Sequence, residues 1–285
     1  MEQEGLRMIY GLDLETDHDN DSAWCVQWVL ADKDGEVHGT DVRPLVHRIE
    51  AICKKQGRDF IYVHNLHYDV QFLKDDLYLM QERGYLIRPV IRNNRELCVQ
   101  IYRKGQKPEN KDKPGVELRD SAAKFPGKLR ELGETIGLPK LENSDPDFSP
   151  GWASKVDFDD PKEWEYVIRD ATIVQRAMQE WHDLGFKRMT LSGDAWADAR
   201  RTVGRKRWDA FFPPLDALTD RILRKAYSGG INYSKPGTHR HVTHEDKVSM
   251  YPGVMMYADL PIGPPVDMGG IEPNPEYGGL YVAEK

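Results

Sequence analysis

Residues 7–16 read RMIYGLDLET, an apolar run that ends in two acidic residues. Residues 7–14 of this run predict a β-strand. Because side chains two apart on a strand point to the same face, Asp13 and Glu15 project together from its end. Two carboxylates held this close repel each other unless a cation lies between them, and hard divalent metals prefer oxygen ligands. The strand therefore predicts part of a metal site, although an Asp-x-Glu pair also arises by chance about once or twice in so acidic a chain.

A second polar motif follows the strand predicted for FIYVHN at residues 60–65. Asp69 stands in the first turn of the next predicted helix, a common place for an acidic residue because it interacts favourably with the helix dipole. His64, Asn65 and Tyr68 gather at the same strand-to-helix turn. Since α/β proteins place ligand-contacting groups at such turns, the motif indicates a site as well as a helix start.

A third motif lies on a long helix predicted for residues 160–185, with Asp159 or Asp160 as its cap and Pro161 at its start. Tyr166 and Asp170 are four residues apart and share one face of that helix. Taken alone, the pair could be a half-buried tyrosine beside a surface aspartate. At a metal site, the tyrosine hydroxyl could instead orient a water molecule for attack.

The rest of the pattern predicts an α/β fold, with a mixed sheet flanked by helices. Further strands are predicted at SAWCVQWVLA (22–31), EVHGTDV (36–42), YLIRPVIR (85–92), ELCVQIYRK (96–104) and VELRDS (116–121), and further helices at 43–56, 68–84 and 127–137. From about residue 190 the pattern changes to helical segments and then to Gly/Pro-rich sequence. A second structural unit is therefore predicted there.

Composition favours a soluble globular protein, with 285 residues, 39% hydrophobic and 31% charged. We expect no membrane span and no secretion signal. Cys25, Cys53 and Cys98 lie far apart, so we expect them to be reduced and buried rather than to bind zinc. The net charge of −7 does not favour a nucleic-acid partner, but metal ions would compensate clustered carboxylates. Basic residues at 187–207 form either a solvated helix face or a surface near DNA.

The order of the three motifs resembles that of the DEDDy 3′–5′ exonucleases, whose domain is ribonuclease H-like. That order is Asp-x-Glu on the first strand, Asn-x-x-Tyr-Asp after a middle strand, and Tyr-x-x-x-Asp on a late helix. The resemblance implies phosphodiester hydrolysis with two Mg²⁺ or Mn²⁺ ions. It further implies that four carboxylates hold these ions: Asp13, Glu15, Asp69 and Asp170. Tyr166 would position the nucleophile.

The chain also resembles the protein-primed family-B DNA polymerases of phages and linear plasmids. This resemblance implies that four residues hold the single-stranded 3′ end of DNA: Thr16, Asn65, Tyr68 and Ser121. The family carries Ser-Leu where this chain has Ser121-Ala122, so Ala122 departs from the pattern. Turn capping is the alternative role for Thr16, Asn65 and Ser121. Lys140 in LPKLE matches a lysine that assists catalysis in the family, although the loop after it differs in length.

Two later motifs resemble the start of a polymerase palm. AYSGGINY is similar to a Tyr-x-Gly-Gly motif, which implies three template contacts through Tyr227, Gly229 and Gly230, although Gly-Gly also occurs in plain turns. DKVSMYP at 246–252 is similar to the first palm motif, Asp-x-x-Ser-Leu-Tyr-Pro. By this resemblance Asp246 would bind metal and Tyr251 would screen the sugar of the incoming nucleotide. Lys247 departs from the apolar residue usual at its position.

We therefore expect a 3′–5′ exonuclease domain at 1–187 and the opening portion of a palm at 188–285. The second catalytic aspartate of a palm does not occur, so no polymerisation is expected from this chain alone, and we expect it to be a fragment or a shortened gene product. The implied partners are single-stranded DNA 3′ ends and a terminal (priming) protein, in the cytoplasm of a host cell that carries a phage or plasmid.

Two alternatives remain open from the sequence. The first is a non-catalytic remnant that binds DNA or a priming protein. The second is an RNA-directed ribonuclease or a resolvase, against which the two palm-like motifs speak.

Overall fold

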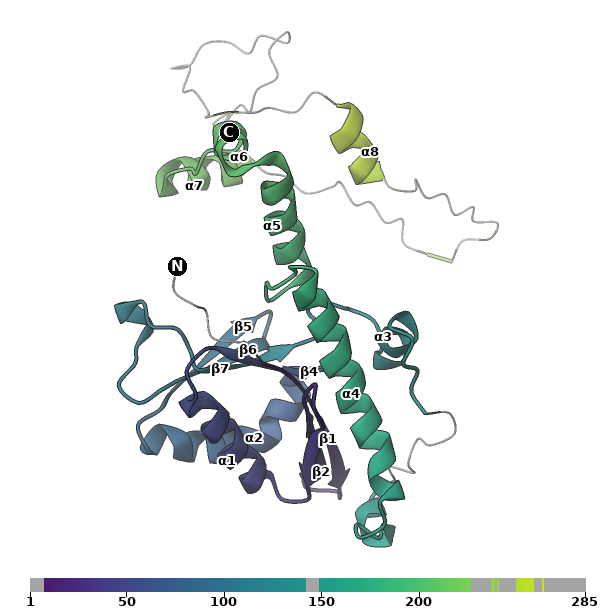
Figure 1. Cartoon of the computed structure of the whole chain (residues 1–285). Helices are drawn as coiled ribbons and strands as arrows, with labels where there is room; N and C mark the ends of the chain where they lie inside the picture. Colours follow the sequence, from purple (N-terminus) through teal and green to yellow (C-terminus); the bar gives the residue numbers. More distant parts are fainter. Residues whose placement is uncertain are drawn as a thin grey trace. The chain divides into compact units, whose positions relative to one another are not determined.

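The computed structural model describes residues 8–141, 149–226, 237–238, 240, 250–258 and 263, and it contains a seven-stranded mixed sheet (Figure 1). The strand order is β3-β2-β1-β4-β7-β6-β5. The strands are β1 (Ile9–His18), β2 (Ala23–Ala31), β3 (Glu36–Gly39), β4 (Asp59–Val63), β5 (Leu86–Arg92), β6 (Arg95–Tyr102) and β7 (Val116–Asp120). β1, β4 and β7 are parallel, and the other neighbours are antiparallel. The predicted α/β class and mixed sheet are confirmed.

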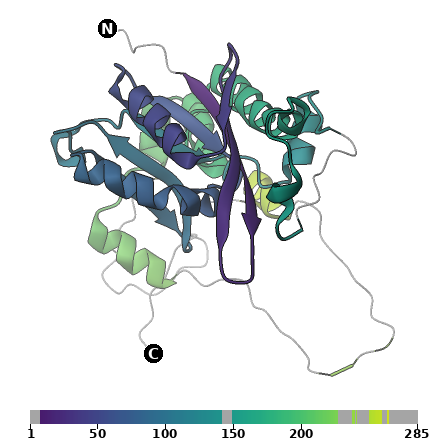
Figure 2. The same ribbon diagram turned by 90° about the horizontal axis from the view of Figure 1, so that it is seen from below.

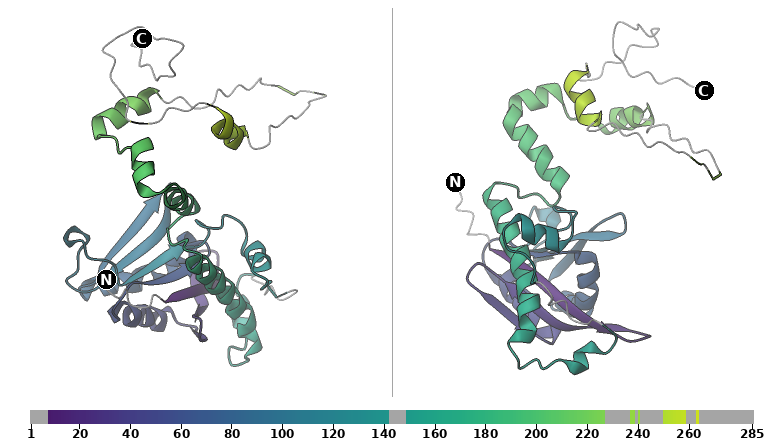
Figure 3. Two further views of the ribbon diagram at one scale, coloured as in Figure 1. Left: turned by 45° about the horizontal axis from the view of Figure 1, so that its top comes forward. Right: turned by 90° about the vertical axis from the view of Figure 1, so that its right-hand side faces the viewer.

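Helices cover both faces of the sheet. α1 (Val42–Lys54) and α2 (Leu66–Glu82) pack on one face, where they bury Leu12 and Leu14 of β1. α4 (Lys162–Asp183) packs on the other face, with α3 (Leu129–Thr135) beside it. Figures 2 and 3 show these two helical layers from other directions. The alternation of β1 therefore sends its leucines to one face and Asp13 with Glu15 to the face that α4 covers.

Gly11 lets α4 lie directly against β1. A side chain at Gly11 would place its Cβ 2.0 Å from the backbone oxygen of Ala171 and 2.6 Å from the backbone nitrogen of Gln175. The side-chain amide of Gln175 donates a hydrogen bond to the backbone carbonyl of Ile9. Only glycine allows two backbones to approach so closely. This contact brings the middle of α4, which carries Asp170, to the strand that carries Asp13.

The chain divides into two compact units, Met1–Asp198 and Ala199–Lys285. The first unit extends past the boundary predicted at 187/188. Its last part belongs to α5 (Leu191–Val203), whose first residue donates a backbone hydrogen bond to the carbonyl of Ala123. The sequence pattern thus changes near residue 190, whereas the two units divide after Asp198.

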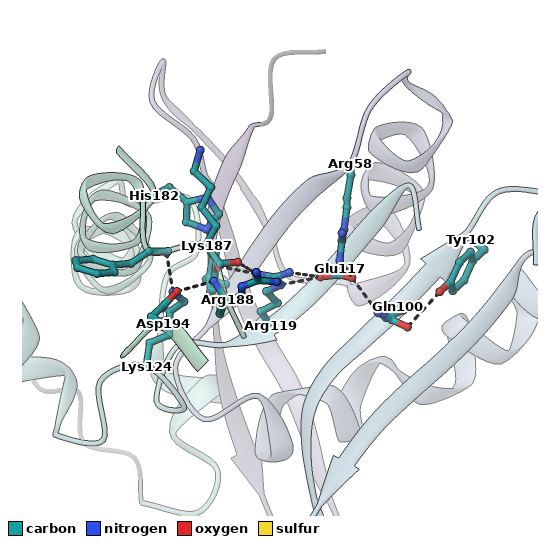
Figure 4. Close-up of polar contacts among 12 residues, drawn as sticks. Arg58, Gln100, Tyr102, Glu117, Arg119, Lys124, His182, Lys187, Arg188 and Asp194 are labelled. Atoms are coloured by element: carbon teal, nitrogen blue, oxygen red, sulfur yellow. Dashed lines mark hydrogen bonds and ion pairs between the residues drawn. The ribbon is translucent and has the colours of Figure 1, made fainter. Parts of the chain in front are cut away.

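Buried polar contacts hold residues 186–194 on the first unit (Figure 4). The ammonium of Lys124 is fully buried, lies 2.5 Å from a carboxylate oxygen of Asp194, and donates to the carbonyl of Phe186. The guanidinium of Arg119 donates to the carbonyl of Lys187 and pairs with the fully buried Glu117 at 2.6 Å. A buried ion pair that lost one partner would leave an uncompensated charge, so these contacts specify the path of the segment.

The remaining described elements are short. They are the 3-10 turns η1 (Pro108–Asn110) and η2 (Trp152–Lys155), and, in the second unit, α6 (Arg205–Phe211), α7 (Ala217–Ala226) and α8 (Met250–Tyr257). Tyr251 lies on α8 with a highly exposed side chain. Four residues with predicted roles in a palm lie outside the described residues: Tyr227, Gly229, Gly230 and Asp246. Among the residues that are described, none of the helices is long and apolar enough to span a membrane.

The three cysteines are free thiols, as predicted. Cys53 and Cys98 are buried, whereas Cys25 is only partly buried.

Candidate active site

Three carboxylates from two distant parts of the chain meet beside the middle of β1. Asp13 and Glu15 come from the strand and Asp170 comes from α4, and one ligand oxygen from each lies within 4.8 Å of the others. Asp170 is buried and the other two are partly buried. The sequence predicted the first pair from strand alternation alone. The third member arrives because α4 packs closely on Gly11.

The electrostatics of this cluster favour a bound cation. Burial raises the pKa of Asp13 well above its usual range, and the nearby charges of Glu15, Asp170 and Asp69 raise it further, while Lys140 opposes them. Burial and the three neighbouring carboxylates all disfavour the ionised form of Asp13. A hard divalent ion with oxygen ligands would offset this repulsion, so the donor set fits Mg²⁺ or Mn²⁺.

Asp69 lies next to the cluster but is not one of its three members. It is buried in the first turn of α2, and burial raises its pKa to about 8, with a further contribution from the charge of Asp120. It is close enough to raise the pKa of Asp13. The carboxylates predicted together from the motif order are thus near one another, with Asp69 on the side of α2.

Lys140 joins the predicted tyrosine to the predicted aspartate of α4. Its ammonium lies 2.6 Å from a carboxylate oxygen of Asp170 and donates to the hydroxyl of Tyr166 at 2.7 Å. Burial works against the charged lysine, but the hydrogen bonds to Asp170 and Tyr166 prevail and raise the pKa of Lys140. Burial also raises the pKa of Tyr166 to about 12, so the tyrosine keeps its proton at neutral pH. The structure thus places Lys140, suggested in the sequence only by resemblance, beside the carboxylates.

Thr16 and Tyr68 lie on the other side of β1, towards α2. The two hydroxyls are 2.8 Å apart, and the ring of Tyr68 is largely exposed. Asn65 precedes α2 in the left-handed backbone region with φ 75°, which asparagine tolerates better than most residues. Its backbone N–H donates to the carboxylate of Asp120 at 3.1 Å. These residues form an exposed polar turn at the carboxyl ends of β1 and β4.

Ser121, for which a contact with the 3′ end is predicted, lies beside His64. Its side chain is fully buried, and its hydroxyl contacts Nδ1 of His64 and donates to the carbonyl of Val63. A direct contact between this hydroxyl and DNA is therefore not available in this structure. Ser121 instead orients His64, whose other ring nitrogen contacts the carbonyl of Gly127. Burial lowers the pKa of His64, which favours the neutral ring.

Asp120 was given no role by the sequence analysis. Its carboxylate accepts hydrogen bonds from the backbone N–H groups of Asn65 and Ala122, and its charge raises the pKa of Asp69. Its position at the end of a predicted strand, directly before Ser121, was the only available signal. An acidic residue at a strand end is too common for that signal to identify it.

Divalent cations should stabilise this protein through the carboxylate cluster. At a concentration about 100 times the dissociation constant, Mn²⁺ should add about 2.7 kcal/mol to the free energy of unfolding and raise Tm by about 5 to 10 °C. Differential scanning fluorimetry with Mn²⁺ and with a chelator would measure this change. The shift should shrink in Asp13→Asn, because one ligand of the cluster is lost. Equal shifts in both proteins would contradict a metal site here.

Asp69, next to the cluster, sets the sign of its contribution to the pH dependence of stability when metal is withheld. The pKa of Asp69 in the folded protein, about 8, is higher than that of an ordinary aspartate, so the folded state binds the proton more tightly. The stability gained from this protonation is complete below the pKa of an ordinary aspartate, about 4, decreases as the pH rises above it, and is lost above about 8.

Comparison with known proteins gives a consistent picture. Residues 158–274 match the family described as DNA polymerase type B, organellar and viral. The DNA polymerase of Bacillus phage M2 is 28% identical over 178 residues, which cover 61% of this chain and 31% of that protein. The DNA polymerase of Bacillus phage phi29 is 26% identical over 167 residues, which cover 57% of this chain and 28% of that protein. The chain thus matches less than a third of the length of either polymerase.

Solved structures show the same fold. Phi29 DNA polymerase complexed with primer-template DNA and incoming nucleotide substrates superimposes with a TM-score of 0.66 and 19% sequence identity, over 80% of this chain and 40% of that chain. The same polymerase complexed with single-stranded DNA gives a TM-score of 0.61 at 20% identity, over 80% and 41% of the two chains. The chain is thus similar in sequence to phage DNA polymerases and shares its fold with part of phi29 DNA polymerase.

Proposed function

We propose that the first unit, Met1–Asp198, is a metal-dependent 3′–5′ exonuclease that removes nucleotides from single-stranded DNA 3′ ends and releases 5′-monophosphates. The observation that carries this proposal is the meeting of Asp13, Glu15 and Asp170 beside Lys140 and Tyr166. The resemblance to proofreading polymerases and the match to phage polymerases support it.

The residues of the site would divide the work as follows. Asp13, Glu15 and Asp170, with Asp69 nearby, would hold two Mg²⁺ or Mn²⁺ ions. When bound, these ions would lower the pKa of the attacking water and stabilise charge on the attacking and leaving oxygens. Tyr166 stays protonated and would orient the attacking water through its hydroxyl. Lys140 holds that hydroxyl and balances the charge of Asp170.

Thr16, Asn65 and Tyr68 would hold the last nucleotides of the single strand. The exposed ring of Tyr68 offers a stacking surface, and stacking on an aromatic ring suits single strands of any sequence. The basic residues at 187–207 would lie near the DNA path. The second unit would be the opening part of a palm, and in a complete polymerase a terminal protein would be a further partner.

The alternative is a module that binds single-stranded DNA without cutting it. The presence of the carboxylate cluster with its lysine and tyrosine argues for catalysis, because binding alone needs no clustered negative charge near a phosphate backbone.

One experiment separates the two. A single-stranded oligonucleotide labelled at its 5′ end is incubated with the protein in Mn²⁺ or in chelator. The proposal expects a ladder of single-nucleotide steps that requires the metal. A mobility shift without shortening would support binding alone. A strand labelled at its 3′ end should release labelled mononucleotide at once. Release of longer labelled fragments instead would indicate an endonuclease.

A further inference from the structure

Asp17 and Trp152 join the end of β1 to the segment that precedes α4. The carboxylate of Asp17 is almost fully buried and accepts hydrogen bonds from the backbone N–H groups of Gly151 at 2.8 Å and Ala153 at 3.1 Å. The indole N–H of Trp152, also buried, donates to the backbone carbonyl of Thr16 at 3.0 Å. Three hydrogen bonds thus connect parts of the chain that are about 135 residues apart.

The chemistry of this contact requires an acceptor-only side chain. The two oxygens of this carboxylate accept from the backbone N–H groups of Gly151 and Ala153, and one of them also accepts from the N–H of His18. An asparagine would place its NH₂ group against one of these donors. Because Asp17 follows Glu15 by two residues, it lies on the same side of β1 as the metal ligands.

The pairing of β1 with β2 is irregular beside this contact. The register between β1 and β2 shifts between Glu15 and Thr16, where Val26 of β2 is left without a partner. Such a bulge loosens the strand ladder and redirects side chains. At this point the hydroxyl of Thr16 contacts that of Tyr68. An anchor on the carbonyl of Thr16 therefore influences where both hydroxyls lie.

We propose that Asp17 and Trp152 are positioning residues that fix Thr16, and through it Tyr68, to receive the single-stranded 3′ end. The proposal rests on the proposed exonuclease function and assigns substrate positioning to two residues outside the motifs. The same segment begins next to Lys140, which contacts Asp170 and Tyr166. Lys140 would thus act in hydrolysis, whereas Trp152 would act in binding the DNA strand.

The test compares KM and kcat for a single-stranded oligonucleotide in Mn²⁺. Trp152→Phe keeps an aromatic six-membered ring but removes the N–H donor together with the five-membered ring of the indole. We expect KM to rise about 5-fold, the size of one neutral hydrogen bond, with kcat changed less than about 2-fold. Asp17→Asn should raise KM about 10-fold, because one anchoring bond is lost and two donors then oppose each other. Lys140→Met should instead lower kcat.

A matched control comes from Trp164, which is also buried and donates its indole N–H to the carbonyl of Phe158 at 3.0 Å. Trp164→Phe loses the same kind of bond, so it should lower Tm by a similar amount and leave KM unchanged. A double-mutant cycle adds a second readout: in a Thr16→Val background, Trp152→Phe should raise KM much less than it does alone.

The outcomes distinguish the two proposals. If the wild-type protein produces no metal-dependent ladder, the exonuclease function fails. If the wild type is active but Trp152→Phe behaves like Trp164→Phe, with lower Tm and unchanged KM, the positioning role is overturned. Full additivity with Thr16→Val would also overturn it.

Discussion

Asparagine in place of Asp13 or Asp170 is expected to slow hydrolysis of single-stranded DNA by at least about 1,000-fold. Asparagine has nearly the same shape as aspartate but carries no charge, so the cluster would lose a ligand for a divalent cation. The metals of such a site provide several kcal/mol of transition-state stabilisation, and each 1.4 kcal/mol corresponds to a tenfold change in rate. The initial rate of nucleotide release in Mn²⁺ measures the effect.

The fold of these variants should survive. In Asp13→Asn, removal of one buried charge relieves repulsion within the cluster, so Tm measured in chelator should stay equal or rise. Asp170→Asn also loses the ion pair with Lys140, so its Tm should be lower than that of Asp13→Asn. Asp157→Asn is the matched control, because Asp157 is an exposed carboxylate that accepts a hydrogen bond from the backbone of Asp159. It should cleave at the wild-type rate. A double variant of Asp13 and Asp170 that degrades single strands like the wild type would disprove the proposed site.

Gly11→Ala is expected to destabilise the first unit by at least about 3 kcal/mol and to abolish nuclease activity with it. The added Cβ would stand 2.0 Å from a backbone oxygen and 2.6 Å from a backbone nitrogen of α4, and neither atom can rotate away as a side chain can. Overpacking typically costs about 1 to 3 kcal/mol even where flexible side chains can adjust. Because α4 carries Tyr166 and Asp170, its displacement would separate both from Asp13.

Urea unfolding followed by tryptophan fluorescence would measure this loss. Gly105→Ala provides the comparison, since Gly105 has a positive φ of 76° and open space around its Cβ position. That change should cost only about 1 to 2 kcal/mol, the penalty of a left-handed backbone. If Gly11→Ala were no worse than Gly105→Ala, α4 would not depend on close approach to β1.

Local patterns in the sequence predicted most of the elements of the first unit. Strand alternation placed Asp13 and Glu15 on one face of β1, and helical spacing placed Tyr166 and Asp170 on one face of α4. Both periodicities depend only on the backbone. The prediction for β1 ended too early, at Leu14, whereas the strand continues to His18. Polar residues at the end of a strand resemble a loop in sequence, and only their pairing with β2 shows otherwise.

The burial and the contacts of individual polar side chains were harder to predict from the sequence. Nothing in the sequence indicated that Ser121 is fully buried, and Lys140 was suggested only by resemblance yet contacts two site residues. Such contacts join residues far apart in the chain. Local periodicity carries no information about them, since it describes which face a residue takes and not what packs against that face.

The sequence by itself thus determined the α/β class, the order of the acidic motifs and the pairing of Asp13 with Glu15. These follow from the backbone geometry of single elements. The tertiary structure alone decided that Asp170 meets this pair, through the contact of Gly11 with Ala171, and that Asp17 and Trp152 anchor the end of β1. Both depend on how closely distant backbones approach, which steric packing sets only when the chain has folded.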